Sequence, residues 1–133
     1  MALITLLLPG LLQASEFPVA ERVVIEKGAR KLHLIQDGKA FRSYKIALGI
    51  RPVGDKKWEG DFKTPEGKYY LDARNPNSDY FLSIHISYPD RKDRREAGEM
   101  GVDQGGAIMI HGQPKDPTLS ETCLLYTSDA ADE

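Results

Sequence analysis

The sequence predicts a mostly β protein, folded as a β-sandwich or barrel, and three observations lead to this class. Short segments alternate apolar and polar residues with a period of two, which is the pattern of half-buried strands. The chain has 12 Gly and 8 Pro residues, many of them between these segments, as in all-β folds with many turns. Helical periodicity is almost missing. A chain of 133 residues forms at most one domain.

Three strands in meander order are predicted in the first part of the chain. Residues 22–26 and 31–36 are β-like, and residues 39–48 return after them. Asp37 and Gly38 separate the second and third segments, and an Asp-Gly pair is a strong signal for a tight hairpin turn. We therefore expect these segments to pair as antiparallel neighbours.

A long irregular segment, residues 49–65, follows the meander. It is rich in Gly, Pro and charged residues, and unstructured loops of this length are usually functional or disordered. Strands are predicted at residues 68–72, 80–87 and 107–110, with a turn at residues 75–78, where the sequence reads Asn-Pro-Asn-Ser.

Residues 90–99 carry a run of mixed charge. Such a run predicts a solvated face, with a short helix as the alternative.

The composition excludes several classes of protein. Hydrophobic residues make up 41% and charged residues 29% of the chain, which is ordinary for a globular protein. No stretch reaches the roughly 18 apolar residues needed to span a bilayer. The formal net charge is -2, which does not suggest a nucleic-acid binder, since such a protein would show a basic stripe. Cys123 is the single cysteine, which excludes a disulfide framework and a cysteine zinc site.

The N-terminus has features of an export signal. Residues 2–12 are apolar, a Pro-Gly pair interrupts them near the end, and Ala14 offers a small residue for cleavage. Residues 1–14 are therefore expected to be a signal peptide, although the basic segment that usually precedes the apolar run is missing. The alternative is a buried N-terminal segment. Export would place the protein in the periplasm or cell envelope.

His111 is the candidate catalytic base. It directly follows an apolar strand and precedes Gly112, so its ring can reach an open cleft while the backbone turns closely. Histidine titrates near neutral pH and can accept a proton from a thiol or hydroxyl group of a nucleophile further along the chain. His33 is expected to be an exposed strand residue. His85 is expected to be either a hydrogen-bonded surface histidine or a substrate contact.

The other polar features lead to weaker expectations. Neither His33 nor His85 has a carboxylate or thiol at ligand spacing, so no metal site is predicted. The segment at residues 60–67 ends in Thr-Pro-Glu-Gly, which predicts a tight turn. It also fits a rigid wall beside a cleft, and both interpretations can hold together.

Three motifs occur in a defined order along the chain: Thr-Pro-Glu-Gly at 64–67, Ile-His-Ile-Ser-Tyr-Pro at 84–89, and Gly-Ala-Ile-Met-Ile-His-Gly at 106–112. Through these motifs the chain resembles the L,D-transpeptidase catalytic domain, the YkuD-like family. The resemblance covers most of the chain. It implies an L,D-transpeptidase-like β-sandwich or barrel, here expected to be incomplete at the C-terminus.

The resemblance implies a cysteine acyltransferase of the cell wall. In this family a thiolate attacks a carbonyl of a peptidoglycan stem peptide and expels a terminal D-amino acid. The acyl group then passes to an amine of a neighbouring stem or of a lipoprotein, or to water. His111 takes the position of the base, and Gly112, Thr64, His85 and Tyr88 are implied to lie near the substrate. No cofactor, nucleic acid or stable membrane insertion is implied, and the activity would serve cell-wall organisation and cell shape.

The resemblance also implies a Ser-x-Gly-Cys motif downstream of the histidine. The chain offers Ser-Glu-Thr-Cys at residues 120–123, with Thr122 in place of the glycine and a spacing from His111 that is short for the family. Residues 123–133 look like the translated end of a sequencing adapter, so they are interpreted as a non-native tail. The catalytic domain is then residues 20–122. The nucleophile is expected beyond the truncation, and the fragment is expected to be inactive.

Two alternatives remain. One is a hydrolase on the same scaffold that cuts a stem peptide or a protein–peptidoglycan link with water. The other is a non-catalytic β module that binds the cell wall.

Overall fold

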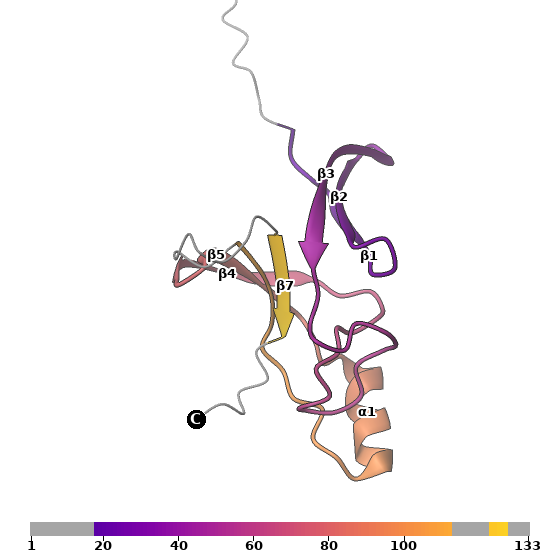
Figure 1. Cartoon of the computed structure of the whole chain (residues 1–133). Coiled ribbons are helices and arrows are strands. Elements are labelled where there is room, and N and C mark those ends of the chain that lie inside the picture. Colours follow the sequence, from indigo (N-terminus) through magenta and orange to yellow (C-terminus); the bar gives the residue numbers. More distant parts are fainter. Residues whose placement is uncertain (1–17, 113–122, 128–133) are drawn as a thin grey trace, which may run out of the picture.

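The computed structural model describes residues 18–112 and 123–127, and within them the fold is mostly β (Figure 1). This confirms the predicted class. The elements of the described residues, in chain order, are β1 (Arg22–Glu26), β2 (Lys31–Gln36), β3 (Lys39–Ala47), β4 (Leu71–Ser78), β5 (Phe81–Ile86), α1 (Arg91–Met100), β6 (Ile108–His111) and β7 (Cys123–Thr127).

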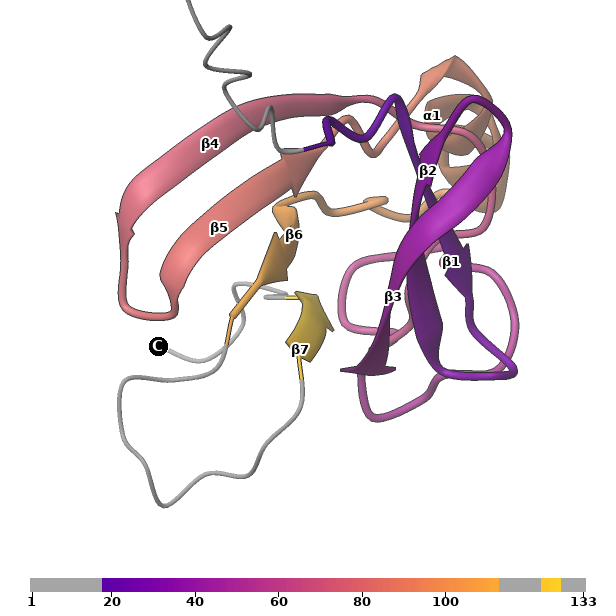
Figure 2. The ribbon, with the colours of Figure 1, turned by 90° about the horizontal axis from the view of Figure 1, so that it is seen from above.

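The strands form two antiparallel groups that meet at β7. β1, β2 and β3 make the predicted meander, and β4, β5, β6 and β7 make the second group. β3 and β7 run parallel, with Ile46 paired to Cys123 and Ala47 to Leu124. The order across the described strands is therefore β1-β2-β3-β7-β6-β5-β4. Figure 2 shows the meander on one side of β7 and the long curved β4–β5 hairpin on the other.

The turn between β2 and β3 is the predicted Asp-Gly hairpin turn. Asp37 has φ 49° and Gly38 has φ 73°, so both residues adopt the left-handed conformation that a two-residue type I′ turn requires. The first two strands have the predicted bounds, and β3 ends one residue earlier than expected. Local turn chemistry therefore fixes the register of this meander.

The prediction for β4 was wrong in its position. Residues 68–70 lie outside any strand, and the predicted turn at residues 75–78 belongs to β4. β4 is the outermost strand of its group, where Pro76 can lack an N–H group without breaking an internal ladder. A register shift between Asn75 and Ser78 accommodates the Asn-Pro-Asn sequence, and the chain turns at the next two residues instead.

The run of mixed charge forms a helix, α1, over residues 91–100, so the alternative prediction of a short helix is confirmed. Asp90 caps its N-terminus: its side chain accepts a hydrogen bond from the Asp93 N–H group, and the Asp93 side chain accepts one from the Asp90 N–H group. Gly101, with φ 69°, ends the helix in a left-handed C-cap. The cap signals therefore outweigh the poor apolar periodicity of the run.

One apolar cluster joins the two groups of strands. Its buried members are Leu32, Ile46, Ile86, Tyr88 and Ile108. They come from β2, β3, β5, β6 and the segment after β5, so both groups contribute to one core. Each such side chain contributes roughly 1.5–3 kcal/mol by leaving water.

Several predictions lie outside the described residues. The predicted signal peptide at residues 1–14 is one of them. Of the predicted tail at residues 123–133, the structure describes only β7. Within the described residues, no helix is long and apolar enough to cross a membrane.

Candidate active site

His111 is the last residue of β6, and the strands on both sides hold it in place. Its backbone pairs with Ser83 in β5 and with Leu124 in β7, and the residue is only 6% exposed. The ring Nδ1 lies 2.7 Å from the carbonyl oxygen of Gly112. A carbonyl oxygen only accepts hydrogen bonds, so Nδ1 carries the proton and donates it. In the neutral ring this leaves Nε2 as the basic nitrogen, as a general base requires.

Tyr80, in the turn between β4 and β5, packs against this histidine. The two ring centroids are 4.3 Å apart at an interplanar angle of 43°. The same turn explains the glycine after the histidine, because a Cβ atom on Gly112 would lie 3.0 Å from the Tyr80 carbonyl oxygen. Sequence analysis missed Tyr80, since an aromatic residue beside a polar turn is not a specific signal.

His85 shares a sheet face with His111. Ser83 pairs with His111 and His85 with Met109, and directly paired residues project from the same face of an antiparallel sheet. The isoleucines at the alternate positions project toward the apolar cluster. The face that carries His111 is therefore the polar face of β5 and β6.

The carboxylate of Asp72 orients His85. The His85 Nδ1 atom lies 2.5 Å from Asp72 Oδ1, and the His85 side chain is 32% exposed. Asp72 sits at a register shift between Leu71 and Ala73, and such bulges change the direction of a side chain. The structure therefore shows the hydrogen-bonded histidine that the sequence predicted, with its polar partner supplied by the bulge.

Thr64 lies in the long loop, in a position fixed by Lys27. The Lys27 ammonium group donates to the carbonyl oxygens of Gly54 (2.7 Å) and Thr64 (2.8 Å) and to Glu66 Oε1 (2.9 Å). Thr64 is 4% exposed, and within the described residues its Oγ1 atom is buried without a hydrogen-bond partner. A buried hydroxyl of this kind is a candidate for contact with a ligand.

The loop is built around a buried ion pair. Lys56 Nζ lies 3.0 Å from Asp61 Oδ1, and neither side chain is exposed. The Asp61 carboxylate also accepts hydrogen bonds from the N–H groups of Lys57 (2.7 Å), Trp58 (3.3 Å) and Lys63 (3.1 Å). Burial alone would raise the pKa of Asp61, but these hydrogen bonds and Lys56 together lower it below the ordinary aspartate value.

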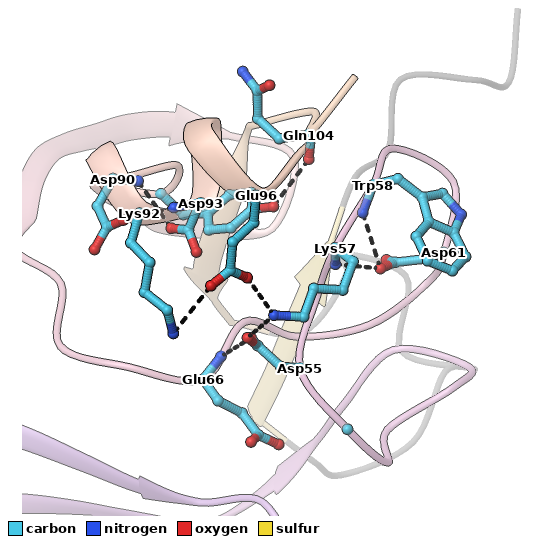
Figure 3. A network of polar contacts seen from close by, with 12 residues as sticks. Asp55, Lys57, Trp58, Asp61, Glu66, Asp90, Lys92, Asp93, Glu96 and Gln104 are labelled. Atoms are coloured by element: carbon cyan, nitrogen blue, oxygen red, sulfur yellow. Dashed lines mark hydrogen bonds and ion pairs between the residues drawn. The ribbon is translucent and has the colours of Figure 1, made fainter. Parts of the chain in front are cut away.

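Ion pairs join this loop to α1 (Figure 3). Lys57 Nζ lies 2.7 Å from Glu96 Oε2 and 3.0 Å from Asp55 Oδ2, and Asp55 Oδ1 accepts a hydrogen bond of 2.7 Å from the Glu66 N–H group. Hydrogen bonds to Glu96 and Asp55 raise the pKa of Lys57. The hydrogen bond from Lys57 lowers the pKa of Glu96. The loop that was predicted to be functional or disordered is therefore ordered, and ion pairs and hydrogen bonds hold it together.

Tyr88 belongs to the apolar cluster. It is 3% exposed, its ring meets Tyr69 edge-on at 5.9 Å, and its hydroxyl donates to the Gln104 carbonyl oxygen at 3.0 Å. Tyr88 thus ties the end of β5 to the segment that leads into β6. Of the residues predicted for the site, the structure brings His111, Gly112 and His85 to the polar face. It places Thr64 in the loop and Tyr88 in the core.

Cys123 begins β7. Its backbone pairs with Ile46, and the next residue, Leu124, pairs with His111. The backbone of the single cysteine therefore lies one residue from the position opposite the histidine. The assignment of Cys123 to a non-native tail stays a prediction.

Metal ligation has no candidate among the described residues, where no group of three or more His, Cys, Asp or Glu side chains could hold an ion.

Comparison with known proteins determines the family. The family model of the L,D-transpeptidase catalytic domain (YkuD) matches residues 20–130. The chain belongs to this family. The match confirms the resemblance drawn from the three motifs, and it extends through β7.

Two curated relatives are similar to the chain. Both carry the name "Putative L,D-transpeptidase YafK", one from Escherichia coli strain K12 and one from Escherichia coli O157:H7. Each is 36% identical over 117 residues, which cover 84% of this chain and 44% of the relative. The chain thus spans less than half the length of these relatives. No solved structure gives a significant match.

Proposed function

We propose that this domain comes from an exported enzyme of the cell envelope that transfers acyl groups on peptidoglycan stem peptides. The observation that carries the proposal is His111, whose Nδ1–H group is held by the Gly112 carbonyl oxygen at the end of β6. Its Nε2 atom is thereby set up as a base. Membership of the L,D-transpeptidase family and the name of the YafK relatives support this role.

The proposed reaction is a two-step acyl transfer. His111 Nε2 takes the proton of a cysteine thiol, and the thiolate adds to a stem-peptide carbonyl, whose oxyanion is held by N–H groups. Collapse of this adduct breaks the amide bond, and His111 gives its proton to the departing amine of a D-amino acid. An amine of a neighbouring stem or of a lipoprotein, or water, then attacks the thioester and releases the thiol.

The other predicted site residues take substrate-binding roles in this proposal. Gly112 lets the Tyr80 turn approach closely, and His85 offers a ring held by Asp72 on the face of His111. Thr64 offers its buried hydroxyl. Tyr88 holds the segment before β6 in position through its hydroxyl group.

In this proposal the nucleophilic cysteine lies outside this chain, in a Ser-x-Gly-Cys motif of the parent protein, and the fragment is inactive. One observation favours the competing assignment to Cys123, namely the pairing of its neighbour Leu124 with His111. Intact-mass measurement after incubation with a tetrapeptide stem or a β-lactam separates the two. An unmodified chain is expected. An adduct that disappears in Cys123→Ser would assign the thiol to Cys123 and end the claim of inactivity.

The test of the activity itself uses the parent gene. Reading the source DNA past the codon for Thr122 is expected to reveal a Ser-x-Gly-Cys motif within about twenty residues, close enough for a base and its nucleophile to pair. The full-length enzyme should then form a thioester with the stem peptide. His111→Gln should slow acylation by about 10²–10⁴-fold. A full-length protein that carries the cysteine and stays unacylated would refute the proposal.

Two further experiments separate the alternatives. Product analysis with and without an added amine acceptor distinguishes transfer from hydrolysis. For a non-catalytic wall-binding module, the complete gene would lack the cysteine. For such a module, neither the wild type nor His111→Ala would show turnover, and the substitution would leave binding to sacculi unchanged.

A further inference from the structure

The helix α1 presents three arginines on one outward face. Arg91, Arg94 and Arg95 are exposed and follow the i, i+3, i+4 spacing that places side chains side by side on a helix. The buried residues of the helix, Asp93 and Ala97, lie on its inner side. We call the three arginines the arginine face. Both views place α1 near the open end of the β4–β5 hairpin and away from its turn (Figures 1 and 2).

The acidic residues of α1 are mostly turned inward, which leaves the outer side basic. Asp93 accepts a hydrogen bond of 3.1 Å from the Tyr69 hydroxyl, and Glu96 is bound by Lys57 at 2.7 Å and by Lys92 at 3.6 Å (Figure 3). Glu99 is the exposed acidic residue, one turn beyond Arg95. These inward contacts fix which side of the helix packs against the molecule, so the arginine face is turned outward.

Arg91, the first residue of the arginine face, occupies the end of the helix where cations are unfavourable. The backbone dipole gives a helix N-terminus partial positive charge, so basic residues stabilise the last turn and destabilise the first. In α1 the arginines begin at the first helical residue, and the last turn has no basic residue. A local arrangement that works against helix stability points to a functional demand elsewhere.

We propose that the arginine face docks carboxylate groups of polymeric peptidoglycan. This inference rests on the proposed function, which makes an anionic polymer the substrate. Guanidinium groups bind carboxylates through two parallel hydrogen bonds. Three arginines within little more than one turn can engage several carboxylates of a repeating polymer, and weak contacts joined in this way reinforce one another. The docking site lies apart from His111, so it retains the enzyme on the wall while the catalytic face stays open.

The test is co-sedimentation of the whole chain with purified sacculi at low ionic strength. The variant R91Q/R94Q/R95Q is compared with K31Q/K39Q/K45Q, which removes the same charge from exposed positions of β2 and β3. The arginine variant should bind about tenfold more weakly, since each exposed ion pair contributes little alone. The lysine control should stay within about twofold of the wild type, because its positions lie outside the docking surface. Vesicles that contain phosphatidylglycerol serve as the second ligand.

Three results would overturn the docking proposal: wild-type chain that stays in the supernatant with sacculi, equal loss in the two variants, or arginine-dependent binding to the vesicles alone. The arginine variant should remain folded, because it removes cations from a helix N-terminus. Single Arg94→Gln, expected to weaken binding by about two- to threefold, tests the proposal if the triple variant unfolds. Acylation of a soluble stem peptide is scored separately, on the full-length parent protein that carries the cysteine. If acylation fails while arginine-dependent binding to sacculi is observed, the proposed enzyme activity is refuted and the docking proposal is not.

Discussion

Two regions of this molecule are held together by different forces. The sheet region is joined by the apolar cluster around Ile108, which has no exposed surface. The loop–helix unit, defined as residues 49–67 with α1, instead buries Lys56 and Asp61 and is linked by Lys57 to Glu96. The unit that carries Thr64 is therefore organised by directional, charged contacts, and the strands that carry His111 by non-directional burial.

The difference has consequences for how each region tolerates change. Apolar packing loses stability in proportion to the atoms removed, and it does not respond to pH. A buried charged contact depends on both partners, because the survivor of a deletion is left as an unpaired charge in the interior. We therefore expect sensitivity to single polar substitutions and to acid to be greater in the loop–helix unit than in the apolar cluster of the sheet region.

The largest effect is expected for Asp61→Ala. The substitution removes the buried carboxylate that pairs with the Lys56 ammonium group and accepts hydrogen bonds from three backbone N–H groups. We expect a loss of about 3–5 kcal/mol in the free energy of unfolding, measured by urea denaturation. The control Asp79→Ala changes an exposed carboxylate and should stay within about 0.5 kcal/mol of wild type. Equal stability of the two variants would contradict the role given to the buried pair.

A somewhat smaller effect is expected for Ile108→Ala, the corresponding change in the sheet region. The variant removes buried methyl and methylene groups from the centre of the cluster, at a cost of about 2–4 kcal/mol. Val53→Ala, at a position that is 84% exposed, serves as the control and should cost less than about 0.5 kcal/mol. The Ile108→Ala loss should be the same at pH 7 and pH 4. A strong pH dependence of that loss would break the division between the two regions.

The smallest effect is expected for Asp55→Asn, and it should depend on pH. Burial raises the pKa of Asp55, but hydrogen bonds from Glu66 and Lys57 outweigh it and leave the pKa below the ordinary 3.8. A carboxyl group with a lowered pKa stabilises the fold above the unfolded-state pKa and loses this contribution as the pH falls through the folded-state pKa.

The variant should therefore be less stable than wild type by about 1 kcal/mol at pH 7. The difference should shrink as the pH falls through the folded-state pKa of Asp55, which lies below 3.8. Burial raises the pKa of Asp93, which acts with the opposite sign and favours the folded state as the pH falls. Urea denaturation of both proteins across this range measures the difference. A difference in stability that stays constant as the pH falls would show that Asp55 acts through shape and not through charge.

The sequence was informative where local chemistry decides the structure. Asp37 and Gly38 specify one turn type, and the alternation of Leu82, Ile84 and Ile86 with polar residues indicates a strand, so the meander and β5 were placed within a residue. His111 was found because an apolar strand leads directly into a histidine and a glycine. These signals need no knowledge of distant parts of the chain.

The sequence was uninformative where contacts span the chain. The position of β4 depends on its place at the sheet edge, and the order of the loop depends on Asp61 and on Lys57 reaching Glu96, 39 residues away. The partner of His85 comes from a bulge in another strand, and the packing of Tyr80 on His111 joins a turn to a strand end. Local sequence patterns do not indicate such long-range pairings.

The three bonds of Lys27 set an order for folding. They connect the β1–β2 turn to residues 27, 37 and 39 positions further along the chain. Closing segments of this length has an entropic cost that the later contacts must repay, so long-range contacts form after local ones. The meander forms first and positions Lys27, and the loop then closes by accepting its hydrogen bonds. We infer that the loop with Thr64 becomes native after the meander, so limited proteolysis should cut the loop before it cuts β1, β2 or β3.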